Sequence, residues 1–245
     1  MDGKGGTFAL VVPGPTVSNL PQATFTVAKT ADAAGLDLLS SNLVPDPNST
    51  LNFIQWFAEV KNNGTAAACF VQITINFKTA GGGCVKAMHA YADSDTYKID
   101  VSDTLIPCIP PGKSGVFCDN DLPAAPVNLA SIVRIEAQLT LSPYPGAVLN
   151  PSNPTLSDVA LVPDPTNGDG YWAIVGTLTA TTSIYNIGIS GYYKNREGMI
   201  LDSGSATNLG TVRAGASWAF TTFYYVGAQP SSYLLFVDYL LGAGP

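Results

Sequence analysis

The sequence predicts an all-β protein made of two tandem antiparallel β-sandwiches with an N-terminal strand extension. The first observation is a repeat, because Leu43–Pro47 and Leu161–Pro165 share the sequence Leu-Val-Pro-Asp-Pro. The second is that each copy is followed by runs in which apolar and polar residues alternate, as they do in half-buried strands. The third is the content of Gly 24 and Pro 18, the residues that favour turns.

The repeat divides the chain into two units of roughly 100 residues, the usual size of a two-sheet sandwich. We expect an N-terminal strand extension at 1–38, a cysteine-containing first sandwich at 39–145, a Pro-rich linker at 146–155 and a second sandwich at 156–245. A chain of 245 residues is long enough for both sandwiches.

Two strand-like segments, Thr7–Val12 and Ala23–Ala28, precede the first repeat and are separated by prolines. The simpler expectation is that they add edge strands to the first sandwich. The alternative is that one of them pairs with a neighbouring molecule, since an unpaired strand is able to complete the sheet of another chain.

In the first sandwich, the alternating stretch Phe53–Val60 predicts a strand, and Asn62–Thr65 predicts the turn after it. Every second residue is apolar from Cys69 to Phe77, which predicts a long strand with one buried face. The three glycines at Gly81–Gly83 end that strand.

In the second sandwich, the matching strands are expected at Trp172–Leu178 and Tyr185–Tyr193. The turn between them is expected at Ala180–Ser183, and the turn after them at Asn195–Gly198.

One further turn is common to both copies. Ile109–Phe117 and Val212–Phe220 place a Gly and a Phe at the same separation. The Gly permits the positive φ of a tight turn, and the Phe begins the next strand with a large core residue. Each copy then closes with a strand, expected at Ile132–Leu141 and Tyr233–Tyr239.

Composition limits the classes of partner. Hydrophobic residues make up 46% of the chain and charged residues 12%, which favours a packed core. With 18 acidic and 11 basic residues the formal charge is −7, which disfavours nucleic acid and anionic membrane surfaces as partners. The apolar stretch Tyr233–Gly242 is too short to span a bilayer, and Met1–Gly6 does not begin a signal peptide.

All four cysteines lie in the first repeat, at Cys69, Cys84, Cys108 and Cys118. An even number within one unit predicts two disulfides and an oxidising compartment. One pairing joins Cys108 to Cys118 across the Pro110–Gly112 turn. Another pairs Cys84 with Cys108 and leaves Cys69 for Cys118. Zinc is disfavoured because the spacings contain no Cys-x-x-Cys pair.

At this point the sequence resembles known families. An Asn-Asn-Gly-type turn, a long alternating strand and Pro-Gly-Lys-Ser before a Phe are similar to bacterial FxLYD-type immunoglobulin-like domains. Tyr192–Gly198 resembles the end of that pattern, with Lys194 in place of its Asp. Val60–Ala68 is similar to bacterial cell-adhesion-related sandwich domains. The resemblance covers 39–145 and 156–240, and it implies tandem immunoglobulin-like β-sandwiches of the envelope or cell exterior that bind or space other molecules.

The sequence predicts no enzyme. His89 is the single histidine, and there is no Gly-x-Ser-x-Gly elbow to supply a nucleophile. Gly112–Ser114 imitates the end of a phosphate-binding loop, but the two prolines before it remove backbone N–H donors. The carboxylate pair of a glycosidase would have to come from residues in undistinguished settings, among them Glu59, Glu136 and Glu197.

No cofactor is predicted. Calcium is the ion for which the sequence offers candidates, because acidic turns supply the hard oxygens that calcium prefers. These turns are Asp93 with Asp95, Asp119–Asp121 and Asp164–Asp169. Solvated surface acids are the simpler account of them.

A candidate interaction surface is the aromatic run Phe223, Tyr224 and Tyr225. Neighbours on a strand face opposite ways, so at least one of these rings is expected to be exposed. An exposed aromatic patch suits a protein partner or, with weaker support, a sugar.

The function expected from these features is a non-catalytic secreted or cell-envelope module for adhesion, spacing or protein binding. Its partner would be a protein or a second copy of the chain, outside the cell or in its envelope. The alternative is a structural subunit of an extracellular filament or virion assembled through strand edges. The low charge and the strand-like N-terminal segments favour that alternative.

Overall fold

The all-β prediction is confirmed. The computed structural model describes residues 8–13, 23–45, 54–99, 105–119, 129–141, 147–149, 154–164, 167, 170–223, 225–242 and 244. These residues are mostly strands, with two short 3-10 helices, η1 (Asp32–Gly35) and η2 (Leu129–Ser131), and no α-helix among them.

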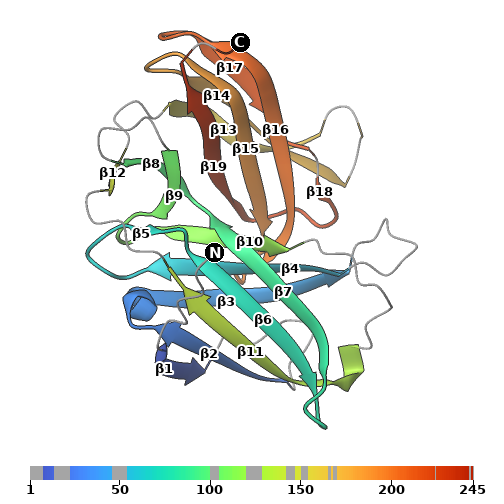
Figure 1. Cartoon of the computed structure of the whole chain (residues 1–245). Coiled ribbons are helices and arrows are strands. Elements are labelled where there is room, and N and C mark those ends of the chain that lie inside the picture. The colour runs from blue at the N-terminus through green and yellow to red at the C-terminus, as the bar shows by residue number, and fades with distance from the viewer. Residues whose placement is uncertain are drawn as a thin grey trace. The chain divides into compact units, whose positions relative to one another are not determined.

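The chain divides into two compact units (Figure 1). Unit 1 comprises Met1–Ser94 and Pro107–Pro145, and unit 2 comprises Asp95–Ile106 and Gly146–Pro245. The chain therefore crosses between the units after Ser94, after Ile106 and after Pro145. This division differs from the expected boundaries, which placed 95–106 within the first sandwich.

Unit 1 is built on one mixed sheet. Its strands are β1 (Phe8–Pro13), β2 (Thr24–Thr30), β3 (Leu36–Pro45), β4 (Ile54–Asn62), β6 (Gln72–Thr79), β7 (Cys84–Asp93), β10 (Ser114–Asp119) and β11 (Ile132–Thr140). Their order is β1-β2-β11-β6-β7-β10-β4-β3, and β2 runs parallel to β11. A separate short ladder joins β5 (Ala68–Cys69) to the end of β9 (Leu105–Ile109).

The N-terminal strands pair within their own chain. β1 lies at one edge of the sheet, antiparallel to β2, and β2 lies inside the sheet between β1 and β11. Phe25 and Val27 of β2 are buried in the core, which accounts for this position. In this structure the segment therefore completes unit 1 of the same molecule.

The core of unit 1 follows the alternation of its strands. On β6, Ile73, Ile75 and Phe77 are buried, while Thr74 and Asn76 between them are half-buried. This matches the long strand with one apolar face that the sequence predicts. Burying each such side chain contributes about 1.5–3 kcal/mol. The same core contains Trp56, Phe117, Ile135 and Leu139, and each of these side chains is fully buried.

Within the described residues, unit 2 is built mainly on a four-stranded and a three-stranded sheet. Its strands are β8 (Asp95–Ile99), β12 (Ala147–Leu149), β13 (Thr155–Pro163), β14 (Tyr171–Thr179), β15 (Ile184–Lys194), β16 (Ile200–Val212), β17 (Ser217–Thr221), β18 (Tyr225–Val226) and β19 (Ser232–Leu241). One sheet has the order β13-β14-β17, with β18 also paired to β14, and the other has the order β16-β15-β19. β8 pairs with β12, which lies in the stretch expected to be a linker.

The sequence repeat is also a repeat of strand order. The arrangement β3-β4-β10 in unit 1 corresponds to β13-β14-β17 in unit 2, and β11-β6-β7 corresponds to β19-β15-β16. The shared glycine turn has one geometry in both copies, because Gly112 and Gly215 each have φ of 75°. Gly112 N donates to Asn62 O at 2.7 Å, and Gly215 N donates to Ala180 O at 2.8 Å. The predicted turn is thus confirmed in both units.

Candidate interaction site

Thr222 and Phe223 form a corner between β17 and β18 that is bonded to both sheets of unit 2. On β14, Thr222 N donates to Ile174 O at 2.9 Å, and Ile174 N donates to Thr222 Oγ1 at 3.1 Å. On β16, Phe223 N donates to Ser205 O at 2.9 Å. The corner therefore holds one sheet to the other.

The buried phenol of Tyr193, on β15, completes this corner. Its hydroxyl donates to Phe223 O at 2.8 Å and lies 2.8 Å from Thr222 Oγ1. A phenol has one hydrogen to donate, so the Thr222 hydroxyl is the donor to Tyr193. The result is a continuous chain of hydrogen bonds from Ile174 N through Thr222 and Tyr193 to Phe223 O. Bonds in such a chain polarise and strengthen one another.

Burial raises the pKa of the Tyr193 phenol above its ordinary value of 10.0, and the charges of Asp202 and Asp164 raise it further. The hydrogen bonds from Thr222 and Ile174 act in the opposite direction. Burial also raises the pKa of Tyr225. Both groups are therefore neutral at physiological pH, as a hydrogen-bond donor must be.

We expect Tyr193→Phe to lower the free energy of unfolding by about 1–3 kcal/mol at pH 7, because it leaves the carbonyl of Phe223 without this donor. A raised phenol pKa contributes stability that is fully present below pH 10 and is lost as pH rises through the pKa of the folded state. The variant should therefore lose less stability than the natural chain between pH 10 and pH 12, as measured by urea unfolding. Parallel pH profiles would contradict this role.

The ring of Phe223 points into solvent although its backbone is held at both its N–H and its C=O. Its side chain is 72% exposed. A Cβ at Gly204, on β16, would lie 2.2 Å from Phe223 O, so the approach of the corner to β16 requires glycine there. A large apolar ring on a fixed backbone loses little conformational freedom on binding, which suits an anchor at an interface.

The two tyrosines that follow Phe223 differ from it. Tyr225 is half-buried, and its ring stacks on that of Tyr193 with centroids 5.5 Å apart. Tyr224 lies outside the described residues. Of the aromatic run expected to form an interaction surface, Phe223 is the ring that the described structure presents to solvent.

The cysteine pairings expected from the sequence are wrong. The disulfide joins Cys69 to Cys108, which are directly opposed on β5 and β9 with a Cα–Cα distance of 3.9 Å. The expected hairpin between Cys108 and Cys118 does not form, because β10 pairs with β4 and β7 while β9 pairs with β5. Pro107 and Pro110, on either side of Cys108, also lack the N–H groups that a longer ladder there would need.

Cys84 and Cys118 are thiols in this structure, so the expected second disulfide is also incorrect. Cys84 begins β7, whereas Cys118 follows Phe117, which pairs with Ala92 at the far end of β7. Eight residues of strand span about 26 Å, and Cα atoms more than about 7 Å apart cannot be bridged without backbone movement.

The residues considered for catalysis are not brought together. His89 lies exposed on β7. Its ring and that of Tyr91 pack in a T-shaped arrangement with the ring centroids 5.4 Å apart. Glu136 is ion-paired with Lys78 and Arg134, and the hydrogen bond from Lys78 lowers its pKa. Glu59 lies on β4, four strands from β11 in the sheet order. Glu59 is flanked by the core residues Ala58 and Val60, and Glu136 by the core residues Ile135 and Ala137, so each glutamate lies on the face of its strand opposite the core.

Backbone N–H groups of the turn at Gly112–Ser114 donate hydrogen bonds to carbonyl groups of the protein itself. Gly112 N donates to Asn62 O, and Lys113 N donates to Pro110 O at 3.1 Å. Two amides that a phosphate loop would direct at its ligand are therefore engaged within the protein. Within the described ranges there is no group of three or more His, Cys, Asp or Glu residues placed to hold a metal.

The acidic turns proposed for calcium are described in part. Asp164 is buried, and its Oδ2 accepts a hydrogen bond from Asn167 Nδ2 at 2.8 Å. Asp119 Oδ2 accepts from the backbone N–H of His89 at 3.1 Å. Both carboxylates therefore serve as local acceptors. Asp93 is the last residue of β7 and Asp95 the first of β8, whereas Asp121 and Asp169 lie outside the described residues.

Unit 1 has a pocket of about 370 Å³ bounded by η1 and by the loop between β4 and β5. Much of its wall is small residues, from Gly64 to Ala68. The side chain of Asn62 also lines it, but its amide donates to Ala66 O and Ile109 O, and its Oδ1 accepts from Gly64 N. The amide thus holds the surrounding loops and has no donor left for a ligand.

None of the helices in the described ranges has the length and apolar character that a membrane span needs. No protein-family model and no curated protein matches the sequence. Among solved structures, the chain is similar to the crystal structure of red sea bream transglutaminase at 12% sequence identity and a TM-score of 0.24. The match covers 84% of this chain and 29% of that one. At so low a TM-score the likeness has no bearing on fold or activity.

Sequence reasoning missed the residues that position Phe223. Tyr193 and Thr222 lie in alternating stretches like those of any buried strand, and no local motif marks Gly204. The one available signal was the aromatic run itself, which required at least one ring to be exposed.

Proposed function

We propose that this protein is a non-catalytic secreted or cell-envelope module whose two tandem immunoglobulin-like β-sandwiches present a protein-binding surface centred on Phe223. The observation that carries the proposal is the exposure of this ring on a backbone bonded to β14, β15 and β16. Exposed aromatic residues on rigid supports are frequent anchors of protein interfaces.

The immunoglobulin-like assignment is supported by the strand order that both units share. In each unit, the first, second and fifth strands of the repeat lie side by side, and so do the fourth, third and last strands. These two groups are separate sheets in unit 2 and parts of one sheet in unit 1, where β7 pairs with β10. Two such groups of antiparallel strands resemble the pattern of an immunoglobulin-like sandwich. The resemblance of the turns to FxLYD-type and adhesion-related domains agrees with this assignment.

The proposed location outside the cytoplasm is supported by the disulfide between Cys69 and Cys108, because such bonds persist in oxidising compartments. Both cysteines are 0% exposed, so reductants have little access to the bond in the folded state.

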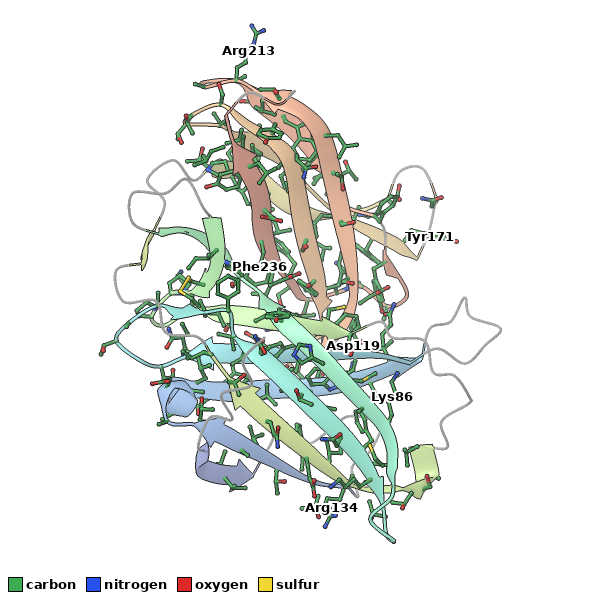
Figure 2. All side chains as sticks on the ribbon, in the orientation of Figure 1. Lys86, Asp119, Arg134, Tyr171, Arg213 and Phe236 are labelled. Atoms are coloured by element: carbon green, nitrogen blue, oxygen red, sulfur yellow. A yellow bond between two sulfur atoms is a disulfide. The ribbon has the colours of Figure 1, made fainter. Side chains whose placement is uncertain are left out.

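The proposal is tested by placing a photo-crosslinking phenylalanine analogue at position 223 and irradiating the protein in its native cellular extract. We expect a dominant adduct with one polypeptide. The matched control carries the analogue at Arg213, which Figure 2 shows pointing outward from the turn between β16 and β17. The same adducts from both positions, or none from position 223, would overturn the proposal.

Once the crosslinked polypeptide is known, Phe223→Ala should weaken its binding about 30-fold or more, the effect of losing a central aromatic anchor. Isothermal calorimetry gives the affinity, and circular dichroism checks that the variant is folded. The control is Arg213→Ala, which should bind as the natural chain does.

A further inference from the structure

The unit 1 sheet has an outer face, opposite its core, that crosses the three adjacent strands β11, β6 and β7 (Figure 1). Leu139 of β11, Ile73 of β6 and Ala90 of β7 point into the core. Because successive residues of a strand face opposite ways, the residues on either side of these three lie on the outer face. They are Gln138 and Thr140 of β11, Gln72 and Thr74 of β6, and His89 and Tyr91 of β7.

The pairing of the strands arranges these six residues in two rows. One row contains Thr140, Gln72 and Tyr91 in directly opposed positions, and the other contains Gln138, Thr74 and His89. Neighbouring strands lie about 4.8 Å apart and alternate residues of a strand about 6.8 Å apart, so the six Cα atoms span about 10 by 7 Å. The six side chains therefore form one compact surface, which we call the outer-face patch.

Tyr91 gives the outer-face patch an exposed aromatic ring. Its side chain is 52% exposed, and it packs against the ring of His89 in a T-shaped arrangement with the centroids 5.4 Å apart. A tyrosine ring offers a flat apolar face and a hydroxyl at its edge. A sugar ring is built in a matching way, with C–H groups on its faces and hydroxyl groups around its rim.

The polar side chains of the patch are available to a ligand. Among the described residues, no hydrogen bond within the protein engages the side chains of Gln72, Gln138, Thr74 or Thr140. Amide and hydroxyl groups both donate and accept hydrogen bonds, as sugar hydroxyls do. The patch differs in this respect from the pocket at Asn62, whose amide is fully used by the surrounding loops.

The charges on and around the patch favour a neutral ligand. None of its six residues is Asp, Glu, Lys or Arg. The next charged groups on the same face, Lys78 and Arg134, are both paired with Glu136. At the margin of the patch Asp119 accepts a hydrogen bond from the backbone N–H of His89, and the whole chain has a formal charge of −7. An anionic glycan would be repelled, and a protein partner would find a single apolar ring where interfaces usually offer several.

We infer that the outer-face patch is a binding site for a neutral glycan. One sugar ring stacks on Tyr91, and hydroxyls of that sugar and the next exchange hydrogen bonds with the amides of Gln72 and Gln138. This site goes beyond the proposed function, because it lies on the other unit from Phe223 and takes a different class of ligand.

The test is affinity electrophoresis of the full chain in native gels that contain a soluble neutral polysaccharide. The four probes are mixed-linkage β-glucan, xyloglucan, galactomannan and dextran. We expect at least one of them to retard the natural chain. Tyr91→Ala should weaken that binding about 10-fold or more, as for the loss of a central aromatic contact, whereas Tyr91→Phe should retain most of it. Gln138→Ala should weaken it about 5-fold, the effect of one lost hydrogen bond.

The matched control is Tyr171→Ala, which alters a half-buried tyrosine of unit 2 and should be retarded like the natural chain (Figure 2). Circular dichroism checks that each variant folds, and the exposed Gln138→Ala decides the matter if Tyr91→Ala does not. The inference would be overturned by a natural chain that none of the four probes retards, by retardation in the acidic probe polygalacturonate alone, or by retardation that survives both Tyr91→Ala and Gln138→Ala.

The two proposals fail separately. Photo-crosslinking from position 223 reports on the protein-binding surface of unit 2, and electrophoresis reports on the outer-face patch of unit 1. A chain that gives no adduct from position 223 but is retarded through Tyr91 overturns the proposed function and supports the glycan site. The opposite pair of results supports the proposed function and overturns the glycan site.

Discussion

Replacing both Cys69 and Cys108 by alanine is expected to lower the free energy of unfolding of unit 1 by about 4 kcal/mol. The disulfide links positions separated by 39 residues, and cross-linking a loop of that length restricts the unfolded chain. β5 is only two residues long and lies against β9 at this bond, so little else holds that ladder. Urea unfolding followed by hydrogen-exchange mass spectrometry measures the unfolding of unit 1 separately from that of unit 2.

The control for this variant is Cys84→Ala, which alters an exposed thiol and should change the stability by no more than about 0.5 kcal/mol. A double variant that unfolds at the same urea concentration as the natural chain would show that the bond does not restrain the unfolded state as we expect.

Phe117→Ala and Phe220→Ala are each expected to destabilise their own unit by about 3–5 kcal/mol. The two residues occupy the same place in the repeat, directly after the glycine turn, and both are buried. Each removal leaves a cavity in the core that the sheets cannot close without losing their ladders. The measurement is again urea unfolding with exchange detection, and the loss should be confined to unit 1 for Phe117 and to unit 2 for Phe220.

Phe223→Ala is the matched control, because it makes the same substitution at an exposed ring of unit 2. It should leave the unfolding of unit 2 within about 0.5 kcal/mol of the natural chain. A loss at Phe220 no larger than at Phe223 would mean that the repeated Phe is not the core anchor of its strand.

The parts of the fold that the sequence predicted are those set by neighbouring residues. Alternation identified β6 and β15 because a strand turns successive side chains to opposite faces. The glycine turns at Gly112 and Gly215 were predicted because positive φ is rare for other residues. In both cases a few adjacent residues carry all the information that is needed.

The alternation of neighbouring residues could not predict which strands far apart in the sequence pair with each other. Cys108 and Cys118 are near in sequence, yet β9 and β10 pair with different neighbours, so the expected disulfide fails. Likewise, strand alternation required one exposed ring among Phe223, Tyr224 and Tyr225 without indicating which. The exposure of Phe223 depends on Tyr193 and Ser205, which are far from it in sequence.

The discontinuous course of unit 2 has a consequence for biosynthesis. Its segment Asp95–Ile106 leaves the ribosome well before the rest of the unit, which begins at Gly146. The pairing of Ile99 with Ala147 has to wait for the residues between them, a delay of about 2–10 s at bacterial and eukaryotic elongation rates. Meanwhile the intervening residues supply β10 and β11, which complete the sheet of unit 1. During synthesis, β8 of unit 2 therefore remains without its partner β12 while the last strands of unit 1 are being made.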